Sequence, residues 1–130
     1  MNISGRLVRN FTLNEMACNG ILVLNPDIVK FAEMMQFLRD LLGKPIKVNS
    51  WYRTAHYNVS IGGSNNSIHL DGRACDIAST DYDRILDYWK FICVYKKCIG
   101  GVNLYDTFIH LDNFEDKFGY TSFIIRDYIS

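Results

Sequence analysis

Apolar residues recur at helical spacing after the Asn25-Pro26 pair. They lie three or four positions apart, as on one face of a helix: Ile28, Phe31, Met35, Leu38 and Leu42. Asparagine is a common helix cap and proline suits the first helical position, so the helix should begin here. Gly43 and Pro45 favour its end. The pattern predicts a long helix that buries one face in the core.

A second amphipathic pattern follows Ser79 and Thr80, and either residue is a suitable helix cap. Its apolar positions are Tyr82, Leu86, Trp89 and Cys93. Acidic residues near its start and lysines at its end complement the helix dipole. A short helix is predicted to start in the capping box Thr12–Glu15, and another to span Thr54–Ile61.

Alternating apolar and polar positions mark the other segments as strands or extended chain. These segments are 46–52, 69–77 around an Asp71-Gly72 turn, 102–105, 107–114 and 123–125. Together with the helices they predict an α+β fold, in which helices pack on a small, mainly antiparallel sheet. The length of 130 residues fits a single domain that spans positions 1–130.

The composition is that of a globular protein and argues against two classes of partner. Formal net charge is zero and no stripe of lysine or arginine stands out, so we do not expect nucleic acid to be bound. No apolar run approaches the length of a membrane span. Residues 1–16 lack the apolar core of a signal peptide, which predicts the cytoplasm of the producing cell or a virion. The four cysteines lack CxxC spacing and are expected to be reduced and mostly buried.

Two of the three histidines lie beside carboxylates in segments predicted as strands. His69 precedes the predicted turn and Asp76 follows it, so a chain that reverses there can bring the two side chains together. His110 comes from a third segment, whose alternation places His110 and Asp112 on one face. Two histidines and one aspartate leave a fourth coordination position open, which is the form of a catalytic zinc site.

By itself this spacing is common, and an exposed histidine near a turn aspartate is the simpler interpretation. The surrounding sequence favours the zinc site over this simpler interpretation. It resembles the zinc D-Ala-D-Ala carboxypeptidases and murein endopeptidases of peptidase family M15, which share a fold with the hedgehog signalling domain. The matching pieces are Asn10–Cys18, Ser50–Thr54, Asn58, Gly62–Gly63, Ser67–Ile77 and Gly101–Asp112. They follow the family order over nearly the whole chain.

The resemblance implies roles for individual residues. The zinc ligands that it implies are His69, Asp76 and His110. Arg53 would bind a substrate carboxylate or an oxyanion, because a guanidinium offers a fork of donors and stays charged; an ordinary surface ion pair is its alternative. Ser67 would hydrogen-bond near the site or cap its loop. His56 does not match a ligand position, and we expect no role for it.

The sequence departs from the family pattern where a general base is expected. Many relatives carry an acid three residues before the last zinc histidine, and here that position is Thr107. Asp112 and Asp106 are the nearby alternatives. We favour Asp112, because strand alternation places it on the face of His110. Orienting His110 is an equally good role for Asp112.

These features predict a zinc-dependent peptidase that cuts peptidoglycan stem peptides or cross-links next to a D-amino acid, with Zn²⁺ as its cofactor. Carboxypeptidase and endopeptidase activity both fit the sequence. We expect a monomer, and a phage lysin or virion-associated enzyme that acts on the bacterial cell wall. The alternative is a catalytically inactive zinc-binding virion or peptide-binding protein of the same fold, because Thr107 replaces the acid.

Overall fold

The computed structural model describes residues 3–65, 67–115 and 122–127, with side chains as far as residue 113. Within these ranges the main sheet has five strands in the order β3-β4-β6-β5-β7. They are β3 (Val48–Ser50), β4 (Ala74–Ile77), β5 (Ile99–Leu104), β6 (Ile109–Glu115) and β7 (Ser122–Asp127). Neighbouring strands run antiparallel except β5 and β7, which run parallel. The predicted α+β class with a mainly antiparallel sheet is confirmed.

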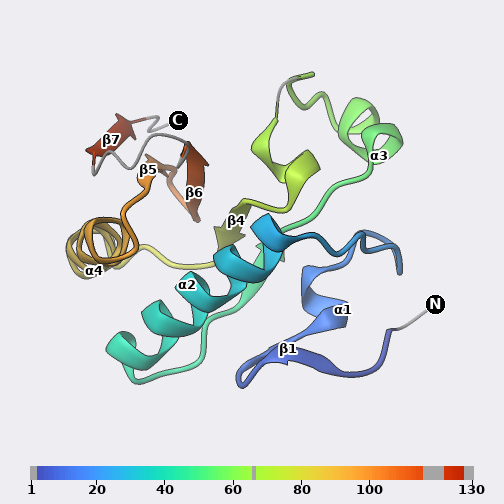
Figure 1. Cartoon of the computed structure of the whole chain (residues 1–130). Coiled ribbons are helices and arrows are strands. Elements are labelled where there is room, and N and C mark those ends of the chain that lie inside the picture. Colours follow the sequence, from blue (N-terminus) through green and yellow to red (C-terminus); the bar gives the residue numbers. More distant parts are fainter. Residues whose placement is uncertain (1–2, 66, 116–121, 128–130) are drawn as a thin grey trace.

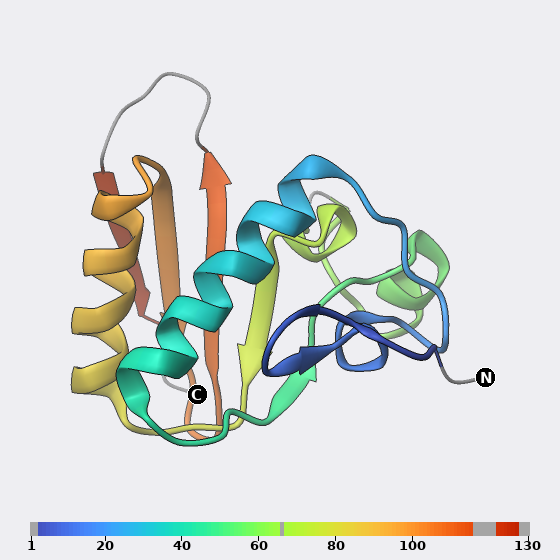
Figure 2. The same cartoon turned by 60° about the horizontal axis from the view of Figure 1, so that its bottom comes forward.

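The helices α2 (Pro26–Leu42) and α4 (Tyr82–Tyr95) cover one face of this sheet (Figures 1 and 2). α2 begins as the sequence predicts, with the Asn25 side chain accepting a hydrogen bond from the backbone N–H of Ile28. It ends at Gly43, which has a left-handed backbone conformation. Among the residues whose side chains are described, the opposite face carries the polar side chains of Asp76, Asn103 and His110.

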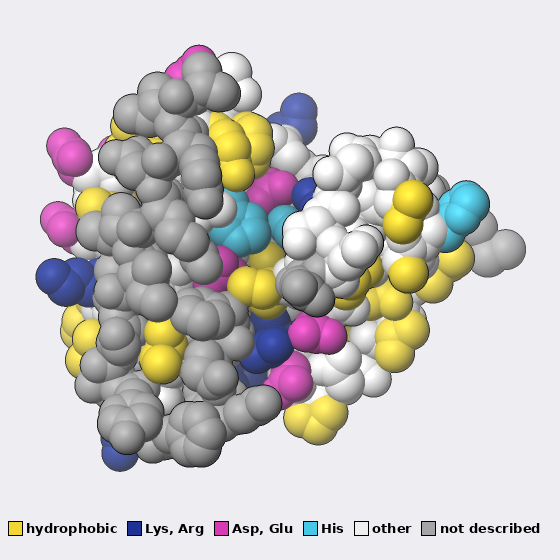
Figure 3. Space-filling view, turned by 90° about the horizontal axis from the view of Figure 1, so that it is seen from above, with side chains coloured by type: hydrophobic (Ala, Val, Ile, Leu, Met, Phe, Trp, Pro, Cys, Tyr) yellow, Lys and Arg dark blue, Asp and Glu magenta, His cyan; other side chains and the backbone are white. Residues whose placement is uncertain are grey.

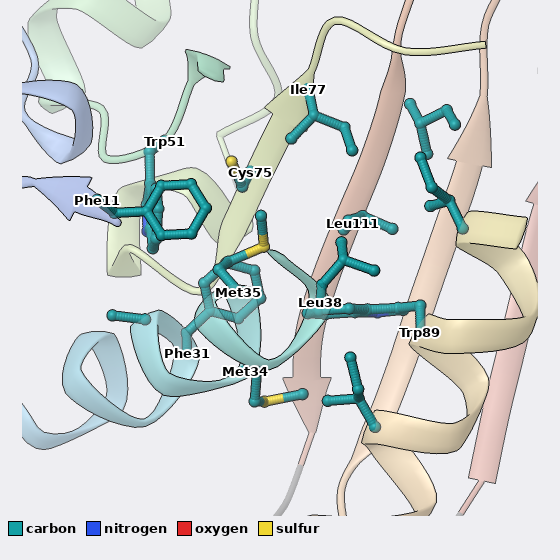
Figure 4. Close-up of a cluster of buried hydrophobic side chains, with 14 of the residues drawn as sticks. Phe11, Phe31, Met34, Met35, Leu38, Trp51, Cys75, Ile77, Trp89 and Leu111 are labelled. Atoms are coloured by element: carbon teal, nitrogen blue, oxygen red, sulfur yellow. The ribbon is translucent and has the colours of Figure 1, made fainter. Parts of the chain in front are cut away.

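Alternation along the central strands supplies the sheet's half of the core. Four inward-facing residues of β4 and β6 are buried: Cys75, Ile77, Ile109 and Leu111. Figure 4 shows apolar side chains of α2 beside several of them, together with Trp89 of α4. The Phe31 ring meets both Trp51 and Trp89 edge to face, with centroids 5.6 Å apart. Because successive strand residues point to opposite faces, Asp76 and His110 lie on the other side.

The N-terminal segment forms a small second sheet and a single helical turn. β1 (Arg6–Val8) and β2 (Phe11–Thr12) pair antiparallel, which the sequence did not predict. α1 (Leu13–Met16) begins with the predicted capping box, in which the side chains of Thr12 and Glu15 each accept the other's backbone N–H. Apolar side chains of this segment reach the core and tie it to α2 and Trp51.

The segment around His69 differs from the strand that the sequence predicts. Ile68–Asp71 is a short 3-10 helix, η1, and β4 begins only after it. The Ser67 side chain accepts a hydrogen bond from the His69 backbone N–H at 3.3 Å, which starts the turn. Gly72 ends it at a φ of 73°, a left-handed conformation that suits glycine. The turn predicted here is present, but it closes a helical segment.

Other element boundaries also differ from the prediction. α4 begins after Asp81 rather than after Ser79 or Thr80, because the Ser79 hydroxyl accepts the Asp81 backbone N–H ahead of the helix. β5 starts at Ile99 rather than at 102, and the glycines between them hid this strand because glycine has low strand propensity. The strand predicted at 123–125 is part of β7.

The remaining short elements follow the sequence more closely. α3 (Ala55–Ser60) is capped by the Thr54 hydroxyl, as its pattern suggests. All four cysteines are buried and form no disulfide, and burial raises the pKa of the Cys75 thiol.

Among the described residues, no helix has both the length and the apolar character needed to cross a membrane.

Candidate metal centre

A row of polar residues crosses the open face of the sheet. The strand register pairs Ser50 with Asp76, Asp76 with His110, and His110 with Asn103. Directly paired residues of neighbouring strands share a face, with Cβ atoms about 5 Å apart. The register therefore brings Asp76 and His110 together at the centre of the row, and η1 adds His69 beside them.

Three potential ligand atoms converge at this point. Asp76 Oδ1 lies 2.8 Å from His110 Nδ1 and 3.2 Å from His69 Nε2. All three atoms lie within 4.8 Å of one another. A tetrahedral zinc ion with bonds of about 2.0–2.1 Å keeps its ligand atoms about 3.3 Å apart. The spacing therefore fits a single metal ion after small side-chain adjustments.

The outer nitrogen of each histidine is held by an acceptor. His69 Nδ1 lies 2.7 Å from the Trp51 carbonyl oxygen, so Nδ1 is the donor and Nε2 faces Asp76. His110 Nε2 donates to Asp112 Oδ2 at 2.9 Å, which turns Nδ1 toward the centre. Metal-binding histidines usually donate their second nitrogen to a carbonyl or a carboxylate in this way. The surroundings thus fix the ring orientations that a metal requires.

The electrostatics of the centre favour a bound cation. Burial alone would raise the pKa of Asp76, but hydrogen bonds from His110 and His69 outweigh it and hold that pKa well below its ordinary value. Burial alone would lower the pKa of His110, whereas hydrogen bonds to Asp112 and Asp76 raise it to about 9. Asp76 is therefore ionised at neutral pH, and His110 carries a proton that a metal ion would displace.

Arg53 lies beside the centre and is held by three contacts. Nη2 lies 3.3 Å from Asp76 Oδ2, while the histidines contact the other oxygen, Oδ1. Nε donates to Ser50 Oγ at 3.2 Å, and Nη1 donates to Asn58 Oδ1 at 3.3 Å. The Arg53 side chain is only 14% exposed. It is therefore a fixed cation at the edge of the centre.

A cavity of about 520 Å³ opens above these residues. In Figure 3, histidine, acidic and basic side chains lie together in a hollow of this face. Besides the three candidate ligands and Arg53, its lining includes Ser64, Ser67, Ile68, Tyr105 and Phe108. The rings of Tyr105 and Phe108 stack with centroids 4.3 Å apart. They form an apolar wall beside a charged floor.

The structure separates the other predicted site residues. Asp112 is fully buried and lines the cavity, whereas Asp106 and Thr107 are exposed in the turn before β6 and do not line it. His56 is exposed on α3, as expected. The geometry therefore favours Asp112 over Asp106, and the contact with His110 Nε2 matches the orienting role.

Sequence reasoning missed three contributions to the site. The Trp51 carbonyl positions the His69 ring, and a backbone carbonyl has no signature in the sequence. Asn103 lines the cavity opposite His110, and antiparallel pairing of the two strands across their tight turn could have located it. Asn58 belongs to the quoted motif but received no role, and its amide bonds Arg53.

A comparison with protein families bears on the same residues. The family model described as Peptidase M15 matches residues 8–112, a range that contains Arg53, Asp112 and all three candidate ligands. The chain belongs to the Peptidase M15 family. A search of curated proteins found no match.

The donor set of this Peptidase M15 chain fits a zinc ion. Imidazole nitrogens and a carboxylate oxygen are common zinc ligands, and three protein ligands leave a position for water or substrate. The donors come from η1 and two paired strands, and an acceptor holds each histidine from behind. His69, Asp76 and His110 are therefore the residues that would hold zinc.

Proposed function

We propose that this Peptidase M15 chain is a zinc-dependent peptidase that cuts peptidoglycan stem peptides or cross-links next to a D-amino acid. The observation that carries the proposal is the convergence of His69, Asp76 and His110 at the floor of an open cavity. The family match supports peptidase chemistry. The resemblance of the motifs to D-Ala-D-Ala carboxypeptidases and murein endopeptidases supports the substrate class.

Zinc bound here would polarise the scissile carbonyl and activate a water molecule. The chain's own residues prepare the site. Trp51 and Asp112 hold the outer nitrogens of the two histidines, so the inner nitrogens keep one orientation. Asp76 brings a negative charge to the cation through Oδ1, while Arg53 fixes its other oxygen.

Arg53 stabilises negative charge on the substrate in this proposal. Each terminal guanidinium nitrogen carries two N–H groups, and the contacts with Asn58 and Asp76 use one on each nitrogen. The second N–H of each nitrogen can therefore serve a carboxylate or a developing oxyanion in the cavity. The three protein contacts hold the guanidinium in place before substrate arrives.

Asp112 orients His110 in this proposal. Its Oδ2 accepts from Nε2, whereas the nitrogen that faces the metal centre is Nδ1. A carboxylate on the Nε2 side of the ring is well placed to fix the imidazole and raise its basicity as a ligand. The role of proton acceptor, which the sequence favoured for Asp112, stays a prediction that substitution can decide.

Mass spectrometry of purified muropeptides, incubated with the zinc-loaded protein, tests the proposed function. Product should accumulate over time. Released D-Ala would identify a carboxypeptidase, and a split stem or cross-link would identify an endopeptidase. His110→Ala should give no product, while the matched control His56→Ala should match the wild type because His56 is exposed outside the site. Stoichiometric retention of intact muropeptides without product would contradict the proposal.

A catalytically inactive zinc-binding or peptide-binding protein is the second candidate. The observation that favours it is the exposure of Thr107, together with the contact that engages Asp112 with His110. Among the described residues of the cavity lining, the carboxylates are only Asp76 and Asp112. The same incubation separates the candidates, because an inactive protein would bind zinc and yield no fragments.

The proposal extends to the working form of the protein. We propose a monomer that acts on the bacterial cell wall as a phage lysin or virion-associated enzyme, without nucleic-acid or membrane partners. The equal numbers of acidic and basic residues support the lack of nucleic-acid binding. Analytical ultracentrifugation tests the monomer, and lysis of bacteria by added protein tests action on the wall.

A further inference from the structure

We propose that Asn58 is a positioning residue, which holds the Arg53 guanidinium and acts on the reaction through it. The inference rests on the proposed function for its catalytic consequence. Its structural basis is a buried amide, a tightly folded loop and a guanidinium with one contact per nitrogen.

The Asn58 side chain is a buried amide with a partner at each end. The residue is 1% exposed. Nδ2 donates to the Ser64 carbonyl at 2.8 Å, and Oδ1 accepts from Arg53 Nη1 at 3.3 Å. A buried amide without partners is costly, so these two contacts define its rotation. Asn58 thereby links the guanidinium to the loop that borders the cavity.

Gly63 shows how tightly this loop folds over the amide. Its backbone N–H donates to the Asn58 carbonyl at 2.8 Å. A Cβ at position 63 would lie 2.1 Å from Asn58 Oδ1, a distance at which the amide must move. Glycine is required here by space, since its backbone is outside the left-handed region. The loop therefore clamps the amide in the orientation that Arg53 uses.

Asn58 completes the frame around the Arg53 guanidinium. Without Asn58, Arg53 Nε would still donate to Ser50 and Nη2 would still contact Asp76, but Nη1 would lose its hydrogen-bond acceptor. The guanidinium plane could then turn about the two remaining contacts. Displacing a group that positions substrate by about 1 Å can cost about a hundredfold in rate. Asn58 does not line the cavity, so its effect must pass through Arg53.

Paired substitutions test this assignment on muropeptides. Asn58→Ala should lower kcat about tenfold to a hundredfold, with KM changed less than about threefold. In an Arg53→Ala background the same change should lower kcat less than about twofold, because no guanidinium remains to be positioned. Asn65→Ala is the matched control, because this asparagine is exposed in the same loop; it should behave as wild type.

Asn58→Asp separates positioning from simple anchoring of the loop. The carboxylate keeps an acceptor for Arg53 but loses the amide donor to Ser64. We therefore expect it to retain most of the kcat that Asn58→Ala loses. Activity as low as that of Asn58→Ala would assign the residue to the loop instead. Equal losses of kcat with and without Arg53 would also overturn the proposal.

A readout without turnover keeps the inference distinct from the proposed function. The NMR signal of the Arg53 Nε–H should be sharp in the zinc-loaded wild type and in Asn65→Ala, and broadened or shifted in Asn58→Ala. Gly63→Ala displaces the amide without removing it, so it should cause the same change even if Asn58→Ala fails to fold. An unchanged signal in Gly63→Ala would overturn the positioning role. An inactive wild type with the expected change would contradict only the proposed function.

Discussion

The Asp76 carboxylate connects the charged groups of the metal centre. Oδ1 faces His69 and His110, and Oδ2 faces Arg53. One side chain therefore links the candidate ligands to the guanidinium proposed to stabilise the substrate. A substitution that moves this carboxylate should affect zinc affinity and turnover together. A substitution of Asp112, which contacts the outer nitrogen of His110, should mainly affect zinc affinity.

Asp112→Asn tests whether Asp112 orients His110. An amide oxygen accepts the Nε2–H less strongly than a carboxylate, so zinc should bind about 10 to 100 times more weakly. Activity should return in excess zinc. Competition with a chelator measures the affinity, and the exposed Asp106→Asn serves as control. Unchanged zinc affinity with abolished turnover would show instead that Asp112 is the proton acceptor.

The metal-free protein should lose stability as pH rises from about 6 to 8. The folded pKa of His110 is raised to about 9, above the ordinary value of 6.5. The proton on His110 therefore stabilises the fold fully below about 6.5, and this contribution declines toward 9. We expect the free energy of unfolding to fall by about 1–2 kcal/mol between pH 6 and pH 8. Urea unfolding at each pH measures it, and a His110→Asn variant with the same slope would refute this source.

At the residue scale, the sequence could indicate which residues form the candidate ligand set. Strand alternation placed His110 and Asp112 on one face, and a chain reversal could bring His69 to Asp76, but the three were chosen as ligands through the resemblance to the family. The contacts that hold these ligands could not be predicted. The Trp51 carbonyl depends on where β3 ends relative to η1, which only packing decides.

At the element scale, the turn η1 and strand β4 set the distance between His69 and Asp76. Ser67 starts the turn and Gly72 closes it against α2. A Cβ on Gly72 would lie 2.5 Å from Ile28 Cδ1, and Ile28 is completely buried. The packing of α2 against Gly72 therefore helps to fix the position of η1, and with it the position of the His69 side chain.

Gly72→Ala should destabilise the protein and weaken its metal site. The substitution combines a left-handed alanine with a clash against Ile28, which together should cost about 2–4 kcal/mol. Gly62→Ala is the matched control, because its φ of 74° is nearly the same and no atom lies within 4 Å of its Cβ. It should lose only about 1–2 kcal/mol. Urea unfolding gives both values, and equal losses would show that the Ile28 contact carries no weight.

Elements with a clear capping or periodic signal could be predicted, whereas very short or glycine-containing ones could not. The caps of α1 and α2 are set by neighbouring residues, and the sequence located both; it also placed the start of α3 to within one residue. The β1–β2 hairpin was missed because its strands have only three and two residues, too few to show alternation. The early start of β5 was missed because Gly100 and Gly101 carry no side-chain pattern. The strand predicted at His69 became a helical turn because Ser67 and Gly72 outweigh its apolar alternation.

At the scale of the whole molecule, the two faces of the main sheet have different roles. The helices bury one face in the core, and the other presents the metal centre and its cavity. Asp76 and His110 thus lie on strands that pack on the core, and His69 lies on η1 directly before β4, which suits a site that must hold its geometry. This division follows from the α+β pattern, but the strand order that centres Asp76 and His110 could not be deduced from periodicity alone.

The zinc content of the purified protein tests the central claim most directly. Metal analysis should find about one zinc per chain, and X-ray absorption should show nitrogen and oxygen ligands at about 2.0–2.1 Å without sulfur. His69→Ala and His110→Ala should lose the metal, whereas His56→Ala should keep it. A wild-type protein that neither contains zinc nor takes it up on addition would contradict the account, as would a His110→Ala variant that holds zinc as tightly as the wild type.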